Sequence, residues 1–282
     1  MSIFKDIRGA VELLKHVDFK QLSALSRKVD LGAAMKQLAR MDEKQLQGLM
    51  KMLNASGGKK DLPEINPDFY ELSDKLTPDQ RALQLKVRSF METEVAPIVN
   101  DFWLRDEFPY DLIPKMGELR LAGITYKGYD CPDLPFLMEG VLAMEMARVD
   151  SSIATFFGVQ SGLTMGSIYM CGSEEQKQEW LPAMNRMEKI GAFGLTEPEV
   201  GSGAAGGLTT TCKQTADGWV LNGQKKWIGN ATFADVVVIW ARNEADGEVK
   251  GFLVRKDTPG FRVEKIRGKM ALRIVQNGLI TL

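Results

Sequence analysis

The chain of 282 residues is long enough for one or two domains, and we expect two. Its 36 basic and 37 acidic side chains nearly cancel, which excludes the strongly basic surface that binding to nucleic acid or to an anionic membrane requires. The single histidine, His16, and three scattered cysteines argue against histidine catalysis, a metal site and a disulfide framework, and they favour a reducing, cytoplasmic location.

Residues 1–63 are predicted to form an amphipathic helical extension and a linker. Leucine, isoleucine, valine and methionine recur at helical spacing from Ile7 to Met52, which indicates short amphipathic helices. We expect their apolar stripe to pack against the rest of the chain or a sister subunit. Residues 55–67 mix small, charged and proline residues, as linkers do. The sequence has no apolar run of about 18 residues and no leader-like opening, so we expect neither a membrane span nor a targeting segment.

Residues 64–188 are predicted to form an all-helical domain. Thr77 has the character of a helix cap and Pro78 suits the first helical position, so a long helix is expected from there to about residue 103. Further helices are expected at residues 111–122, 136–148 and 152–170. Ser173 and Gln176 have the spacing of a capping box, and we expect the helix that they begin to end at Pro182.

Residues 189–282 are predicted to form a small antiparallel, barrel-like β-domain. Short runs of β-branched and aromatic residues alternate there with turn sequences. Asp217-Gly218, Asn222-Gly223 and Asp246-Gly247 each supply the positive φ angles of a tight turn, and Thr258-Pro259-Gly260 adds another turn. The expected fold class is therefore α+β, with a helical domain followed by a β-domain.

Residues 201–206, GSGAAG, match the G-x-G-x-x-G pattern of dinucleotide-binding folds. That fold needs a buried parallel strand before the glycines, a helix opening on them and an acidic residue about 20 positions later. Here the glycines lead into LTTTCKQTADGWVL, which alternates like a strand and closes in a hairpin. We therefore reject a nicotinamide-binding Rossmann fold.

Two motifs around this predicted hairpin resemble the acyl-CoA dehydrogenase family of flavoproteins. The family pattern is Thr-Glu-Pro, then Gly-Ser, then Lys-Trp-Ile about 30 residues later; here these are Thr196-Glu197-Pro198, Gly201-Ser202 and Lys226-Trp227-Ile228. The resemblance covers roughly residues 67–282 and includes MGELRLAGITYKGY, RVDSS and GSEEQK. Short-chain acyl-CoA oxidases and glutaryl-CoA dehydrogenases are the members it resembles most.

The resemblance implies an FAD cofactor and an acyl-CoA substrate. An isoalloxazine ring suits a wall of strands with an aromatic cover, and glycines let the backbone approach a pyrophosphate. The implied reaction passes a hydride from the acyl β-carbon to the flavin while a glutamate removes the α-proton, giving a 2,3-enoyl-CoA. Carried over position by position, the FAD site comprises Phe193, Leu195, Thr196, Gly201, Ser202, Trp227, Ile228 and Gly229, and Ser202 also faces the pantetheine arm of the substrate.

In the family, the glutamate base and much of the oligomer interface lie on a C-terminal four-helix domain, which we expect this chain to lack. No catalytic residue is assigned for that reason, and the resemblance gives Glu197 a structural role. We expect the lone chain to be catalytically incompetent, and a homodimer or homotetramer only where those helices are supplied. The alternative from another class is a non-catalytic, truncated module that binds flavin or CoA.

Three departures from the family pattern bear on the acceptor and the substrate. Gly203 replaces an acidic residue and is expected to loosen its loop. Gly229 replaces a threonine beside the flavin and leaves space for oxygen. The oxidases are also resembled by two segments, WIGN and LRIVQNG. Dehydrogenation with electron-transferring flavoprotein as acceptor is expected, with an oxidase that uses O2 as the alternative. Ala154 stands where glutaryl-CoA dehydrogenases have an arginine for the distal carboxylate, so we expect a short-chain monocarboxylic substrate.

Overall fold

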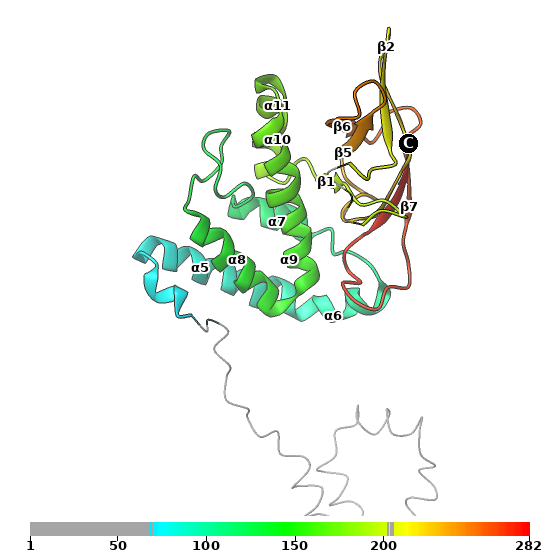
Figure 1. Cartoon of the computed structure of the whole chain (residues 1–282). Coiled ribbons are helices and arrows are strands. Elements are labelled where there is room, and N and C mark those ends of the chain that lie inside the picture. The colour runs from blue at the N-terminus through cyan, green and yellow to red at the C-terminus, as the bar shows by residue number, and fades with distance from the viewer. Residues whose placement is uncertain (1–67, 69, 202, 204–205) are drawn as a thin grey trace, which may run out of the picture. The chain divides into compact units, whose positions relative to one another are not determined.

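A computed structural model describes residues 68, 70–201, 203 and 206–282, which belong to one unit, Pro67–Leu282. Figure 1 shows this unit as a block of helices followed by a block of strands. The α+β class predicted from the sequence is confirmed. The predictions made for residues 1–63, and those for Ser202, lie outside the described residues.

The predicted helices of the first block are present, and two of them contain a wider turn. The long helix expected up to residue 103 passes through a π-turn just before Pro97, which lacks the N–H that an α-helix uses there. The helix expected at 152–170 has a similar turn. In chain order the elements are η1 (Leu72–Lys75), α5 (Pro78–Phe90), η2 (Met91–Val95), α6 (Ala96–Arg105), α7 (Leu112–Leu119), α8 (Phe136–Val149), α9 (Ser151–Gly158), η3 (Val159–Thr164), α10 (Met165–Cys171) and α11 (Glu174–Asn185).

The predicted cap at Thr77 and the predicted capping box at Ser173 and Gln176 are confirmed, and Thr77 also forms a capping box with Gln80. The hydroxyl of Thr77 accepts from the Gln80 N–H at 3.3 Å, and the hydroxyl of Ser173 accepts from the Gln176 N–H at the same distance. The prediction that the last helix ends at Pro182 is wrong, because α11 continues to Asn185. Leu181 and Met184 flank the proline and are fully buried, so their packing holds the final turn in helical form.

The strands of the second block form two sheets. The larger has the order β1-β5-β2-β3 with β6 on the other edge of β5, and the smaller has the order β4-β8-β7. Asp217-Gly218 and Asp246-Gly247 lie in the hairpins that join β2 to β3 and β5 to β6, as predicted. The strands are β1 (Gly191–Gly194), β2 (Thr211–Thr215), β3 (Gly218–Asn222), β4 (Gln224–Ile228), β5 (Val236–Asn243), β6 (Val249–Arg255), β7 (Arg262–Lys265) and β8 (Gly278–Thr281).

Two details of the β-block differ from the expectation. The larger sheet is mixed, because β1 and β2 both run parallel to β5; β1 follows α11 directly, so no hairpin sets its direction. Asn222-Gly223 is not a hairpin turn, since β3 and β4 lie in different sheets. Gly223 instead forms a corner with φ +148°, close enough to Thr210 that a Cβ would lie 2.6 Å from its hydroxyl.

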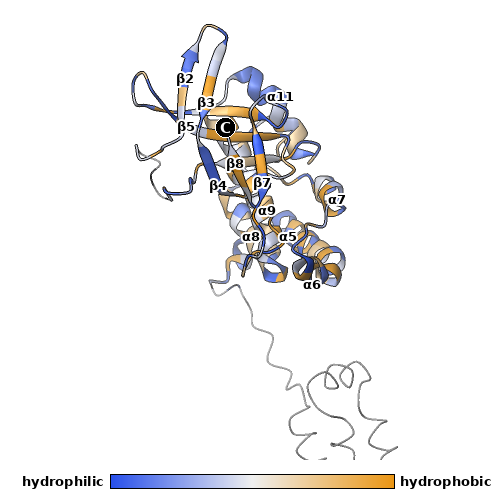
Figure 2. Cartoon of the chain, turned by 90° about the vertical axis from the view of Figure 1, so that its right-hand side faces the viewer, coloured by the Kyte–Doolittle hydropathy of each residue, from blue (hydrophilic) through white to orange (hydrophobic). Residues whose placement is uncertain are grey.

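One hydrophobic core is shared by the helices and the β-block, and a second lies between the two sheets. Val236 of β5 and Ile274 belong to the core of the helices, whereas Val237 and Ile239 pack with Ile280 of β8. Successive side chains of β5 thus face opposite cores, and Figure 2 shows this strand as hydrophobic while β4 is hydrophilic. In the part of the chain described here, no helix is long and apolar enough to cross a membrane.

Candidate functional site

The fold brings together the two motifs that the sequence separates by about 30 residues. The N–H of Lys226 in β4 donates to the carbonyl of Thr196, just after β1, at 2.8 Å. The ammonium of Lys225 donates to the carbonyl of Leu195 at 3.0 Å. We use the word cradle for three segments: Leu195–Thr196, the glycine loop 198–208, and Trp227–Gly229.

The glycine loop has no helix after it. Its described residues lead into β2, so the rejection of a strand-glycine-helix nucleotide site is confirmed. The N–H of Gly207 donates to the carbonyl of Gly203 at 2.7 Å and closes a tight turn. A Cβ on Gly203 would lie 2.1 Å from Cγ1 of Val200, so a side chain at this position would require Val200 to move.

A fully buried ion pair lies beneath the cradle. The Glu197 carboxylate is 2.8 Å from the Lys225 ammonium, and neither side chain is exposed to solvent. The carboxylate also accepts from the N–H and hydroxyl of Thr209, both at 2.6 Å, and from the N–H of Thr210 at 2.9 Å. Burial by itself raises the pKa of Glu197, but the hydrogen bonds from Lys225, Thr209 and Thr210 outweigh it and lower the pKa to about 2. Burial lowers the pKa of Lys225, and the charge of Glu197 opposes that shift.

Trp227 presents its indole ring to solvent, with 52% of the residue exposed. Its backbone has φ +63°, at the irregularity where the pairing of β4 with β8 shifts between Lys225 and Ile228. The side-chain amide of Asn277 donates to its carbonyl at 2.9 Å and holds this geometry. A large, flat aromatic face is therefore exposed near the end of β4, directly after the residue that binds Thr196.

The other predicted site residues differ in what they offer a ligand. Ile228 is 2% exposed and packs between the sheets, so only its backbone remains for contact. Phe193 is half-buried, with its ring 6.2 Å from that of Trp240. A Cβ on Gly229 would lie 3.3 Å from Cγ2 of Val159, so the space expected there is about one methyl group in size. A Cβ on Gly201 would meet no described atom within 4 Å.

The Glu197–Lys225 pair was not anticipated as a unit. Glu197 was assigned a structural role from its motif, whereas Lys225 was not singled out. Simple alternation along β4 places Lys225 and Trp227 on the same face, because they are two residues apart. The left-handed backbone of Trp227 breaks that alternation and sends Lys225 inward and Trp227 outward.

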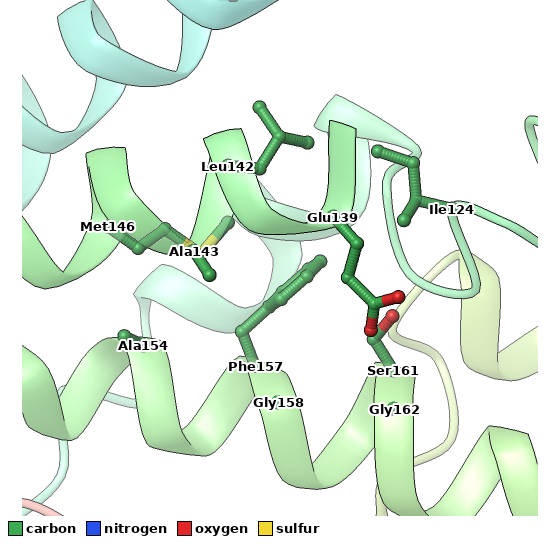
Figure 3. Close-up of a pocket in the computed structure, with 10 residues that line it drawn as sticks. All are labelled: Ile124, Glu139, Leu142, Ala143, Met146, Ala154, Phe157, Gly158, Ser161 and Gly162. Atoms are coloured by element: carbon green, nitrogen blue, oxygen red, sulfur yellow. The ribbon is translucent and has the colours of Figure 1, made fainter. Parts of the chain in front are cut away.

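A separate cavity of about 70 Å³ lies between α8 and the α9–η3 helix. Figure 3 shows the Glu139 carboxylate pointing toward Ser161 at one end of it, with apolar side chains such as Phe157 around the rest. Ala154 contributes a methyl group to the wall. None of the cradle residues lines this cavity, so the two features are distinct.

Comparison with known families identifies both blocks of the fold. Residues 77–188 match the family described as acyl-CoA dehydrogenase, N-terminal domain, and residues 192–282 match acyl-CoA dehydrogenase, middle domain. The first match spans α5 to α11 and the second spans β1 to β8.

Individual relatives are identical to this chain at about a third of the aligned positions. The mitochondrial short-chain specific acyl-CoA dehydrogenase of Rattus norvegicus is 34% identical over 208 residues, covering 71% of this chain and 49% of the relative. An acyl-CoA dehydrogenase of Bacillus subtilis is 33% identical over 204 residues, covering 70% and 53%. The crystal structure of a glutaryl-CoA dehydrogenase from Mycobacterium smegmatis in complex with FADH2 is 37% identical, with a TM-score of 0.72, and covers 76% and 54%. The chain thus spans about half the length of these relatives.

Proposed function

Because the chain belongs to the acyl-CoA dehydrogenase family, of which it carries the N-terminal and middle domains, we propose that it serves the FAD-dependent oxidation of an acyl-CoA thioester to the 2,3-enoyl-CoA. The observation that carries this proposal is the hydrogen bond between Lys226 and Thr196, which joins the family's two motifs into one surface. The M. smegmatis relative was solved with FADH2, which supports a flavin at the corresponding surface here.

The residues of the cradle fit a flavin dinucleotide. Trp227 offers an exposed aromatic plane for a flat ring, and the face around Gly201 is open for a pyrophosphate to approach the backbone. Bound FAD supplies the hydride acceptor. The chain's own contribution is to hold the ring between Thr196 and Trp227 and to exclude water from that face. No carboxylate among the described residues is assigned as the base.

The flavin site is tested by titrating FAD into the 282-residue chain and measuring the quenching of flavin fluorescence. We expect Trp227→Ala to weaken binding at least about tenfold, since stacking on an aromatic face is worth about 1 kcal/mol or more. Trp219→Ala is the matched control, because Trp219 is also an exposed tryptophan of the β-block but lies in the β2–β3 hairpin. Equal affinities for the two variants would refute this assignment.

For the substrate we propose a short-chain monocarboxylic acyl-CoA. Ala154 provides a methyl group where an arginine is needed to pair with a distal carboxylate, and the R. norvegicus relative is short-chain specific. Tighter binding of butyryl-CoA than of glutaryl-CoA to the FAD-loaded chain, measured as a shift of the visible flavin band, is the expected result, and equal binding of the two would contradict the proposed substrate. Anaerobic bleaching of that band is expected only where the family's C-terminal helices supply the base; its absence when they are supplied favours the non-catalytic, flavin- or CoA-binding module.

An acyl-CoA oxidase that uses O2 is the second candidate, and Gly229 is the observation that favours it. The position lacks a side chain, and only Val159 and Val275 lie near where one would begin. Gly229→Thr is expected to slow reoxidation of the reduced flavin by air in an oxidase, because it fills the gap beside the ring. In a dehydrogenase that passes electrons to a flavoprotein, reoxidation by air is slow in both proteins.

A further inference from the structure

The Glu197–Lys225 ion pair contacts one segment of the cradle, at Leu195, and the residues on either side of the glycine loop 198–208. Glu197 directly precedes the loop, and its carboxylate binds Thr209 and Thr210, which directly follow it. Three hydrogen bonds donated by these two residues to one carboxylate thus bring the two ends of the loop together.

Lys225 connects Leu195 and strand β4 to the residue that closes the loop, Glu197. Its ammonium binds the Glu197 carboxylate at 2.8 Å and the carbonyl of Leu195 at 3.0 Å. The next residue, Lys226, donates its N–H to the carbonyl of Thr196. One buried side chain, Lys225, therefore ties Leu195 and Glu197 to strand β4 two residues before Trp227.

Burying such a pair is a costly way to gain stability. Two charges lose their hydration, and an apolar pair of similar volume often stabilises a fold as well. A buried carboxylate that makes only one hydrogen bond would fill the same space in the core. Here all the acceptor capacity of Glu197 is used to hold loop ends and strand β4, which points to a requirement for geometry.

We propose that Glu197 and Lys225 are positioning residues, which hold the two ends of the glycine loop together and tie them to Leu195 and to strand β4, so that the cradle is formed before its ligand binds. Neither side chain reaches the ligand, since both are fully buried. The effect on ligand binding rests on the proposed flavin site, whereas the closure of the loop rests only on the hydrogen bonds of Glu197 and Lys225.

The double substitution Glu197→Gln with Lys225→Met tests it without leaving an isolated buried charge. The amide of glutamine has one acceptor oxygen with two lone pairs and an NH2 group that only donates, so it cannot accept all three hydrogen bonds from Thr209 and Thr210. Amide hydrogen exchange at Thr209 and Thr210 should accelerate at least about tenfold. The dissociation constant for FAD should rise by a similar factor, while the melting temperature stays close to that of the wild type.

Two further variants keep the test decisive. Glu145→Gln changes an equally buried, arginine-paired carboxylate of α8, and it should lower the melting temperature while leaving FAD affinity and the exchange of Thr209 and Thr210 unchanged. Thr209→Val removes one exposed hydroxyl donor without changing charge, and it should weaken FAD binding several-fold even if the double variant does not fold.

Unchanged exchange at Thr209 and Thr210 in the double variant would overturn the loop closure. Unchanged FAD affinity, or an affinity that falls only in step with the melting temperature, would overturn the positioning role. If the wild type binds no FAD while exchange responds as expected, the proposed flavin site fails and the closure of the loop is retained.

Discussion

Glu197 keeps its negative charge inside the protein, and this makes stability depend on acid. Its pKa is about 2 in the folded chain and 4.5 for an ordinary glutamate. A carboxyl with a lowered pKa stabilises the folded state above its unfolded pKa, and that stabilisation is lost as the pH falls from 4.5 toward 2. Urea unfolding at a series of pH values should show a steeper loss in this window for the wild type than for the Glu197→Gln, Lys225→Met double variant. Parallel curves would contradict the assignment.

The same residues show which parts of the site the sequence predicts and which it does not. The sequence predicts Trp227 as a site residue because Lys226-Trp227-Ile228 resembles a family motif. The Thr-Glu-Pro motif predicts Thr196 in the same way. The buried partner Lys225 was missed, because its inward orientation depends on the positive φ of Trp227 at the bulge. A bulge arises from pairing with β8, some 50 residues away, and no local pattern encodes it.

Among the connections between elements, the corner at Gly223 constrains the site most. Gly223 has φ +148° and lies against Thr210, which the Glu197 carboxylate holds. Gly223→Ala should cost at least about 2 kcal/mol of unfolding free energy, because strain and the clash with Thr210 add together. Gly218→Ala, with φ +128° and open space around the Cβ, should cost about 1 kcal/mol from backbone strain alone. Equal costs in urea denaturation would show that the contact with Thr210 is unimportant.

Helix boundaries set by local hydrogen bonds are predictable from the sequence. Ser173→Ala should destabilise the chain by about 1 kcal/mol, because the N–H of Gln176 loses its acceptor. Ser167→Ala is the matched control: its hydroxyl only donates to the carbonyl of Leu163, one turn earlier in η3, so it should be nearly neutral. A thermal denaturation series decides between them, and a neutral Ser173→Ala would show that the cap adds nothing. The last turn of α11 is not predicted from the sequence because buried packing around Pro182 sets it.

At the scale of the whole unit, Gln160 joins the helices to the sheet. It is fully buried, donates to the carbonyls of Met184 and Lys189, and accepts from the N–H of Gly191 in β1. Gln160→Leu removes the side-chain partner of the Lys189 carbonyl and the Gly191 N–H, while the Met184 carbonyl keeps the N–H of Met187; the substitution should cost about 3 kcal/mol in urea denaturation. Gln178→Leu, on the exposed face of α11, should be nearly neutral.

The shared core also predicts that the two blocks unfold together. Val236 and Ile274 of the β-block pack in the core of the helices, so neither block buries its apolar surface alone. Urea denaturation followed by the helical circular dichroism signal and by tryptophan fluorescence should give the same midpoint with both probes. Two separate transitions would show that the helices and strands are independent units. The sequence predicted the order of the blocks, but the parallel pairing of β1 with β5 and the separation of β3 from β4 depend on contacts between distant segments.

The central claim is that the end of β1, the glycine loop and Trp227–Gly229 act as one flavin-binding surface. The most direct test is amide hydrogen exchange of the 282-residue chain with and without FAD. The account predicts that FAD protects residues 193–201 and 226–229 together and leaves α8 and the cavity beside Glu139 unchanged. Protection of only one of the two segments, or of the helices alone, would contradict it.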